Sequence, residues 1–155
     1  MAAAAHEPLL DDLVELSRLM VGLAYRSLHG LHRDLDLPSF RALAFVDRHP
    51  DCTMGQLARG IALPSSSTTR LCDKLVDRKW VRRHHPDANR RQVQLVLTAS
   101  GSRLVAAALS ARRTELAQLV TDLPAEQRAA LGDLLPGLVA AAGTQEPEGS
   151  PAWAV

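Results

Sequence analysis

The segment that decides the fold spans Thr53–Thr98 and reads TMGQLARGIALPSSSTTRLCDKLVDRKWVRRHHPDANRRQVQLVLT. It opens with a capping box, in which Thr53 begins a helix and Gln56, three residues on, reaches back to it. A second helix is predicted from about 65 to 79, because its apolar residues recur at helical spacing along one side. The segment therefore begins with two short helices joined by a tight turn.

The period then changes from helical to alternating. Residues 80–84 read as a strand, and the sequence from Pro86 to Asn89 reads as a turn. Polar and apolar residues alternate from Gln92 to Thr98, which predicts a second strand and hence a β-hairpin with a basic tip. Two short helices followed by a hairpin is the element order of a winged helix-turn-helix, whose second helix enters the major groove of DNA.

Helices are predicted on both sides of this segment. Apolar residues recur every three or four positions from Pro8 to about Arg33, and Pro38 opens a helix that stops before Pro50. A long helix follows from Thr98 to about Val120, and another begins near Leu123. Only 3% of the residues are aromatic, so the core must consist of Leu, Val and Ala, which suits a mainly α fold with a small hairpin wing.

We expect a single domain over residues 8–142. Its winged helix-turn-helix spans about 38–98, and the flanking helices at 8–34 and 99–142 carry wide apolar faces that call for partners. The last segment, 143–155, is polar and rich in Gly and Pro, and it is predicted to be disordered.

Basic residues gather in the fold-deciding segment. The formal net charge of the whole chain is +1, but residues 64–103 contain nine Lys or Arg and three Asp, and so carry a charge of +6. The rest of the chain is correspondingly acidic. On its own a basic helix face is more often a solvated surface, but together with the helix pair and the hairpin it indicates a polyanionic partner.

Several other classes of protein are not indicated. The chain has two cysteines and no C-x-x-C, no charged leader with an apolar core, and no apolar run of about 18 residues, so a reducing cytoplasm is the expected location. No G-x-S-x-G accompanies the serines near 65, so we expect no enzyme and no cofactor. His29 and His32 lie three apart on the first predicted helix but have no obvious third ligand, so we expect no metal site.

Three parts of the chain resemble one known family. TMGQLARGIAL at 53–63 looks like a first motif helix, SSTTRLCDKL at 66–75 like a recognition helix, and NRR at 89–91 with LVLTASG at 95–101 like a wing and its exit into a long helix. The family that these segments resemble is the MarR (multiple antibiotic resistance regulator) family of transcriptional regulators. The resemblance covers roughly residues 9–142.

The resemblance implies the residues that contact DNA. The recognition helix would face bases or nearby phosphates with Ser65, Ser66, Ser67, Thr69 and Arg70. The wing would place Arg90 in the minor groove with Arg91 beside it, and phosphates would be met by Lys74, Arg82 and Arg83. Arginine is the strongest candidate for base readout, because it can bind a guanine edge with two hydrogen bonds.

The sequence departs from the family pattern at three places. Asn89 stands where an acid usually holds a wing arginine, a role that Asp73 would have to fill. Pro64 occupies the usual polar cap position of the recognition helix, which leaves Ser65 as the candidate cap. Lys79 stands where glycine is common.

The resemblance also implies a homodimer and an effector. The terminal helices would pack against a second copy, so the dimer would read an inverted repeat of double-stranded DNA. A small phenolic or amphipathic acid would bind between the dimer helices and the DNA-binding lobe, and the candidate residues are Tyr25, Arg26, Phe40 and Phe45. The phenylalanines serve core packing more readily. The resulting hypothesis is a repressor released by a small molecule or by stress, and the alternative is a winged-helix protein-interaction module that does not read DNA.

The two cysteines are expected to differ. Cys72 lies in register with Leu71 and Leu75, which indicates a small core residue. Cys52 is placed in a turn, where exposure would leave a redox-sensing role open.

Overall fold

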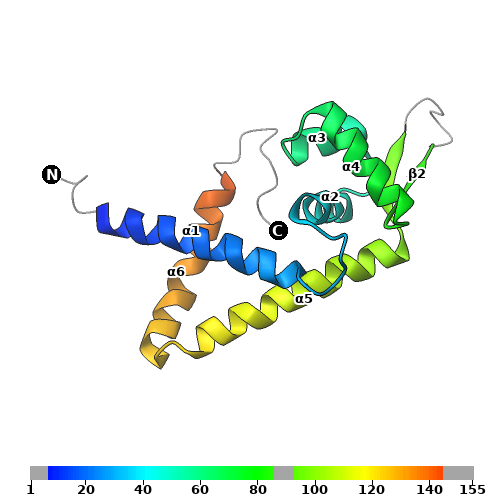
Figure 1. The fold of residues 1–155 in the computed structure, drawn as a ribbon. Coiled ribbons are helices and arrows are strands. Elements are labelled where there is room, and N and C mark those ends of the chain that lie inside the picture. Colours follow the sequence, from blue (N-terminus) through cyan, green and yellow to red (C-terminus); the bar gives the residue numbers. More distant parts are fainter. Residues whose placement is uncertain (1–6, 86–92, 145–155) are drawn as a thin grey trace.

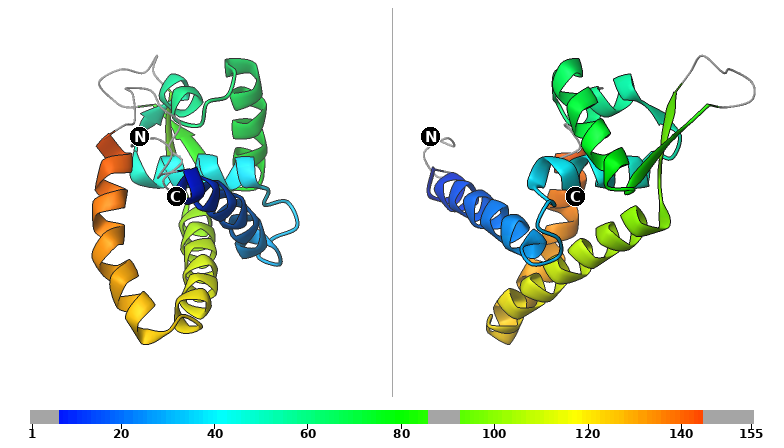
Figure 2. Two further views of the ribbon diagram at one scale, coloured as in Figure 1. Left: turned by 90° about the vertical axis from the view of Figure 1, so that its left-hand side faces the viewer. Right: turned by 45° about the vertical axis from the view of Figure 1, so that its right-hand side comes forward.

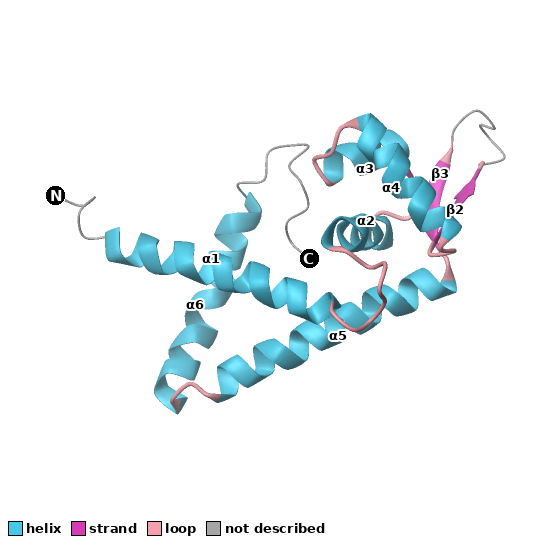
Figure 3. Cartoon of the chain, viewed as in Figure 1, coloured by secondary structure: helices cyan, strands magenta, loops and turns pink. Residues whose placement is uncertain are grey.

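The computed structural model describes residues 7–85 and 93–144 (Figure 1). In chain order the elements are α1 (Glu7–Leu28), α2 (Leu37–Arg48), β1 (Cys52–Thr53), α3 (Met54–Gly60), α4 (Ser65–Asp77), β2 (Val81–His84), β3 (Gln94–Leu97), α5 (Ala99–Thr121) and α6 (Ala125–Thr144). Helices make up most of the chain, and the strands lie together at one end of it (Figure 3). The predicted mainly α fold with a small hairpin wing is confirmed.

The helices form one body, from which α1 and α6 extend (Figure 1). α2, α3 and α4 lie above the first half of α5, and the hairpin stands beside α4 (Figure 1). α1 and α2 both pack on α5. α6 turns back from the far end of α5 and makes few contacts with the rest of the described chain (Figure 2). We call the part from α2 to β3, with the first half of α5, the winged-helix body.

The sheet has one strand that the sequence did not reveal. β3 pairs antiparallel with β2, with Val81 opposite Leu97, and on its other side with β1, with Cys52 opposite Leu95. The prediction that Cys52 lies in a turn where it could be exposed is wrong, because Cys52 belongs to this strand and is buried. A strand of two residues is too short to show the alternation by which strands are recognised in a sequence.

The core lies inside the winged-helix body. Its wholly buried large side chains come mainly from α2, α3, α4 and β3, and include Phe40, Leu43, Leu57, Leu75 and Leu95, and α1 adds Leu23. Two glycines lie where the surrounding atoms leave no room for a side chain. A Cβ on Gly60 would lie 1.9 Å from the Phe45 ring, and one on Gly101 would lie 2.1 Å from the carbonyl oxygen of Trp80.

Local signals account for most helix ends. The capping box at Thr53 and Gln56 is formed as predicted, and Thr98 caps α5 by accepting a hydrogen bond from the Gly101 amide. α1 is shorter than predicted, because it ends at Leu28 and not near Arg33. Gly30 adopts a φ of 88°, which breaks the helix although Leu31 continues the apolar spacing.

α4 ends in a Schellman motif without the usual glycine. The Trp80 amide donates to the Leu75 carbonyl at 3.0 Å, and the Lys79 amide donates to the Val76 carbonyl at 2.8 Å. This geometry requires a left-handed residue at position 79, and Lys79 has a φ of 58°. The family resemblance had marked this as a glycine position, and the backbone supplies the physical reason.

Lys79→Gly is expected to stabilise the fold by about 1 kcal/mol. Glycine relieves the contact that an L side chain makes in the left-handed region, at a smaller cost in chain entropy. Urea unfolding of the two proteins measures the difference. Lys79→Ala is the control, because it removes the charge but retains the strain; if alanine stabilised as much as glycine, the backbone explanation would fail.

Candidate nucleic-acid interface

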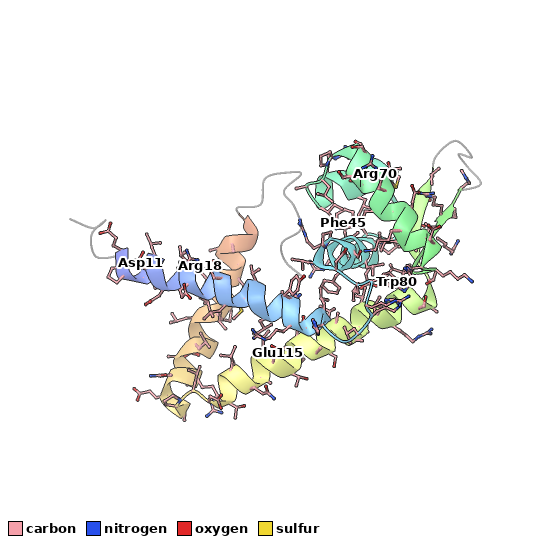
Figure 4. All side chains as sticks on the ribbon, viewed as in Figure 1. Asp11, Arg18, Phe45, Arg70, Trp80 and Glu115 are labelled. Atoms are coloured by element: carbon pink, nitrogen blue, oxygen red, sulfur yellow. The ribbon has the colours of Figure 1, made fainter. Side chains whose placement is uncertain are left out.

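The N-terminal half of α4 presents the polar face that the sequence predicted. The exposed side chains there are Ser65, Ser66, Ser67, Thr69 and Arg70. Thr68 points inward, and its hydroxyl donates to the Pro64 carbonyl at 3.1 Å. Arg70 lies on the far side of the winged-helix body from Glu115 of α5 (Figure 4). Among the described residues Arg70 has no ion-pair partner, so its guanidinium is available to a ligand.

The first turn of α4 carries no side-chain cap. Pro64 occupies the N-cap position, and no side chain in the described part of the chain, Ser65 included, accepts from the first amides of the helix. These amide groups point out of the helix end and carry the positive end of its dipole. The end of α4 that bears the serines therefore also presents donors that suit an anion.

The residues predicted to contact phosphates differ in whether they are paired to an acid within the described part of the chain. Arg82 on β2 is exposed. Lys74 Nζ lies 2.8 Å from Asp36 Oδ2 and 3.1 Å from Ser39 Oγ, and Arg83 donates to Asp73 Oδ1 at 2.5 Å. Arg90 and Arg91 lie outside the described residues. The structure thus brings the serines, Thr69 and Arg70 together on α4, with Arg82 on the adjacent strand.

The Asp73–Arg83 pair ties the recognition helix to the wing. Asp73 comes from α4 and Arg83 from β2, and the hydrogen bond that Arg83 donates to Asp73 raises the pKa of the Arg83 guanidinium. At the other side of β2, His84 Nε2 lies 2.6 Å from Asp51 Oδ1 in the turn before β1. These two contacts hold the base of the hairpin against the body, and the first gives Asp73 a stabilising role toward the wing.

The linker between α1 and α2 packs against α4 through contacts that sequence reasoning missed. Asp36 pairs with Lys74, Asp34 Oδ2 lies 2.9 Å from Arg78 Nη1, and the His32 ring meets Trp80 edge-on at 4.9 Å between centroids. The partners are distant in sequence, so spacing offered no signal. The one local signal was Asp36 before Leu37-Pro38, a common arrangement at a helix start.

Asp36 has two functions in this linker. It caps α2 by accepting from the Ser39 amide at 2.8 Å, and it accepts from Lys74. Partial burial alone would raise the pKa of Asp36, but the hydrogen bonds from Lys74 and Ser39 outweigh it and hold the pKa below its usual value. The ionised form is therefore favoured in the folded chain.

This lowered pKa predicts a pH dependence of stability. The contribution of Asp36 is fully present above the unfolded-state pKa of about 3.9, and it is lost as the pH falls through the lower folded-state pKa. The difference in unfolding free energy between the chain and its Asp36→Asn variant should therefore shrink below about pH 4. Urea unfolding at a series of pH values measures it, and a difference that stays constant or grows on acidification would contradict the assignment.

The four candidate effector residues do not share one cavity. Tyr25 lines a cavity of about 710 Å³ with Leu28, residues of the linker and Lys74. Arg26 donates to Glu115 of α5 at 3.0 Å. Phe40 is fully buried beneath the Arg112 guanidinium, and Phe45 packs against Gly60, so both phenylalanines belong to the core.

Both cysteines are buried within the winged-helix body. Burial raises the pKa of the Cys52 thiol to about 11 and also raises that of Cys72. Cys72 is the core residue that its helical register predicted. At neutral pH both thiols are protonated, which makes them poor nucleophiles.

Neither a metal centre nor a membrane span is found in residues 7–85 and 93–144. No cluster of three or more His, Cys, Asp or Glu side chains is arranged there to hold a metal ion. His29 and His32, predicted to lie on a helix, belong to the linker after α1. No helix in this part of the chain is both long and apolar enough to cross a membrane.

Comparison with known proteins agrees with this geometry. Residues 33–92 match a model of the MarR family, and this stretch contains α2, the helix pair, β2 and the predicted wing tip. RV1404 from Mycobacterium tuberculosis is 28% identical, with a TM-score of 0.78 over 88% of this chain and 94% of that one. The winged-helix part of the chain, residues 33–92, matches the MarR family.

Two further structures show how widely this MarR-family fold is shared. A MarR family protein from Bacillus stearothermophilus is 22% identical, with a TM-score of 0.73 over 88% of this chain and 97% of that one. FabT from Streptococcus pneumoniae, solved in complex with DNA, is 17% identical, with a TM-score of 0.70 over 90% and 98% of the two chains. A search of curated proteins found no match. The family match of residues 33–92 supports a DNA-binding transcriptional regulator with a winged helix.

Proposed function

We propose that this chain is a homodimeric, sequence-specific repressor that binds an inverted repeat in double-stranded DNA and is released by a small molecule or stress signal. The observation that carries the proposal is the face of α4. Exposed hydroxyls, Arg70 and an uncapped helix end lie together there, and β2, which packs on α4, carries the exposed Arg82. Such a surface offers donors to bases and phosphates at once.

We assign the DNA contacts to side chains that are exposed and to the uncapped amides of the first turn of α4. Ser65, Ser66, Ser67, Thr69 and Arg70 are proposed to enter the major groove, with Arg70 reading a base edge and the serines and free amides meeting phosphates. Arg82 would contact the neighbouring backbone. The minor-groove contacts of Arg90 and Arg91 stay a prediction, since those residues lie outside the described part of the chain.

The terminal helices support the homodimer. Large apolar side chains lie exposed on one chain along α1 and α6 and at the end of α5, namely Leu9, Leu10, Val14, Leu16, Leu19, Val21, Leu119, Leu134, Leu135, Leu138 and Val139. Patches of this kind on a water-soluble surface mark interaction sites. A second copy of the chain covers them by two-fold symmetry, which places two recognition helices about 34 Å apart for successive major grooves.

The cavity beside Lys74 supports an effector site. Its volume of about 710 Å³ suits a small organic molecule. Tyr25, Leu28 and Leu35 give it an apolar wall, and Arg33 and Lys74 give it cations, a combination that suits a phenolic or amphipathic acid. A ligand that binds better when the two recognition helices are misplaced for the operator would release the DNA.

Selection of bound fragments from a pool of random duplexes tests the proposal. The expected result is an inverted repeat that binds one dimer, with affinity that falls at least about tenfold between roughly 50 and 200 mM salt. Sedimentation of the free chain should give the mass of a dimer. A single asymmetric half-site would exclude the two-fold arrangement, and binding that ignores salt would favour the protein-interaction module.

A further inference from the structure

The basic side chains of α4 differ between its two halves in whether they are paired to acids. Arg70, Lys74 and Arg78 follow one another at intervals of four residues, so they lie in one row along the helix. Arg70, at the DNA end of the row, has no ion-pair partner among the described residues, whereas Lys74 and Arg78 are paired to acids. Within about two turns of the helix, the row therefore changes from a side chain without an acidic partner in the described part of the chain to side chains that are paired to acids.

The C-terminal half of α4, which carries the paired Lys74 and Arg78, is held by a single short segment. Asp34 and Asp36, both in the linker between α1 and α2, bind Arg78 and Lys74, and His32 of the same linker meets Trp80 just beyond the helix. We call these three contacts the linker clamp. They act on one side of α4 over the stretch from Lys74 to Trp80, which is long enough to restrain the direction of the helix as well as its position.

Lys74 is built into the clamp more fully than a surface lysine. Its Nζ bonds both Asp36 and the hydroxyl of Ser39, and Ser39 is itself completely buried at the start of α2. Asp36 is fixed in turn by its bond from the Ser39 amide. A lysine that reached a phosphate would leave Asp36 without its cation and Ser39 without this donor, so movement toward DNA carries a cost.

We propose that Lys74, through Asp36, is a positioning residue that sets the angle at which α4 meets DNA, in place of the phosphate contact that the sequence suggested. Arg78, through Asp34, supports the same frame. The inference rests on the proposed function, because a positioning residue matters only if α4 reads DNA. Since the linker continues directly from α1, the clamp also joins the proposed dimer helices to the reading helix.

Charge effects and positioning effects have opposite signs at Asp36, and this allows a sharp test. Asp36→Ser keeps a good N-cap for α2 but is too short to reach Lys74. If Asp36 acted only through its charge, its removal would strengthen the attraction of the protein to DNA. If it acts through the clamp, the variant should bind the selected operator about fivefold more weakly and a scrambled duplex nearly as before.

Lys74→Gln supplies the second arm, measured on the full chain with both duplexes over a range of salt. The expected result is a loss of about fivefold on the operator with an unchanged slope of log affinity against log salt. The double variant should lose no more than either single variant, and Lys74→Arg should retain the operator affinity. A slope that drops by about 2 per dimer, close to 0.9 for each lost phosphate contact, would overturn the proposal.

Two controls separate the possible failures. Thermal unfolding confirms that each variant is folded, and if Asp36→Ser is not, the salt slope of Lys74→Gln decides the question alone. A wild-type chain that selects no operator refutes the proposed function. A wild-type chain that binds its operator, together with tighter binding by Asp36→Ser, refutes only the clamp.

Discussion

Gly101→Ala is expected to destabilise the chain by about 3 kcal/mol, a large effect for one added methyl group. The added Cβ would lie 2.1 Å from the carbonyl oxygen of Trp80 and 3.0 Å from its carbonyl carbon. Both atoms belong to the backbone, so no rotamer change can relieve the contact. α5 would have to move away from the base of the hairpin, and the bond from the Gly101 amide to Thr98 would be strained with it.

Gly55→Ala is the matched control. Gly55 also lies in a helix, but nothing is within 4 Å of the position of its Cβ, so alanine should be neutral or stabilising by up to about 1 kcal/mol. Urea unfolding of the two variants measures the contrast. Equal stabilities for both variants would mean that α5 does not pack on Trp80 as described.

Arg70→Ala is expected to weaken operator binding by about 1–3 kcal/mol, or roughly tenfold to a hundredfold. Arg70 is exposed on the face of α4 that carries the serines, and no acid in the described part of the chain neutralises it. The loss should be larger on the selected operator than on a scrambled duplex, because base readout and not only phosphate attraction is removed. Fluorescence anisotropy with both duplexes gives the two affinities.

Arg113→Ala controls for the loss of charge. Arg113 is exposed on α5, so this variant changes the net charge equally without touching α4. It should bind the operator with nearly unchanged affinity and discrimination. An equal loss from Arg70→Ala and Arg113→Ala would show that the chain attracts DNA only through its overall charge.

The parts of the fold that the sequence predicted are those with local causes. The capping box at Thr53, the start of α2 beside Pro38 and the polarity change before β2 all depend on residues a few positions apart. β1 and the early end of α1 depend on partners elsewhere or on one backbone angle. Cys52 forms a strand because Leu95 is there to pair with, and Gly30 ends a helix that the apolar pattern would have continued.

The candidate site was predictable to a similar degree. The exposed face from Ser65 to Arg70 follows from helical period, since Thr68 and Cys72 occupy the buried side. The state of Lys74 does not follow from period, because its partner Asp36 lies 38 positions earlier in the chain. The sequence predicts Lys74 to be part of a basic surface, whereas in the structure it is paired with Asp36.

The burial of both cysteines makes them internal reporters of unfolding. Cys52 and Cys72 are at most 4% exposed, so an alkylating reagent can reach them only when the sheet or the packing of α4 opens. Fraying of α1 or α6 would leave both thiols covered. The rate of thiol modification in a dilute preparation therefore measures the opening of the DNA-reading half of the molecule alone, and the chain should tolerate air without added reductant.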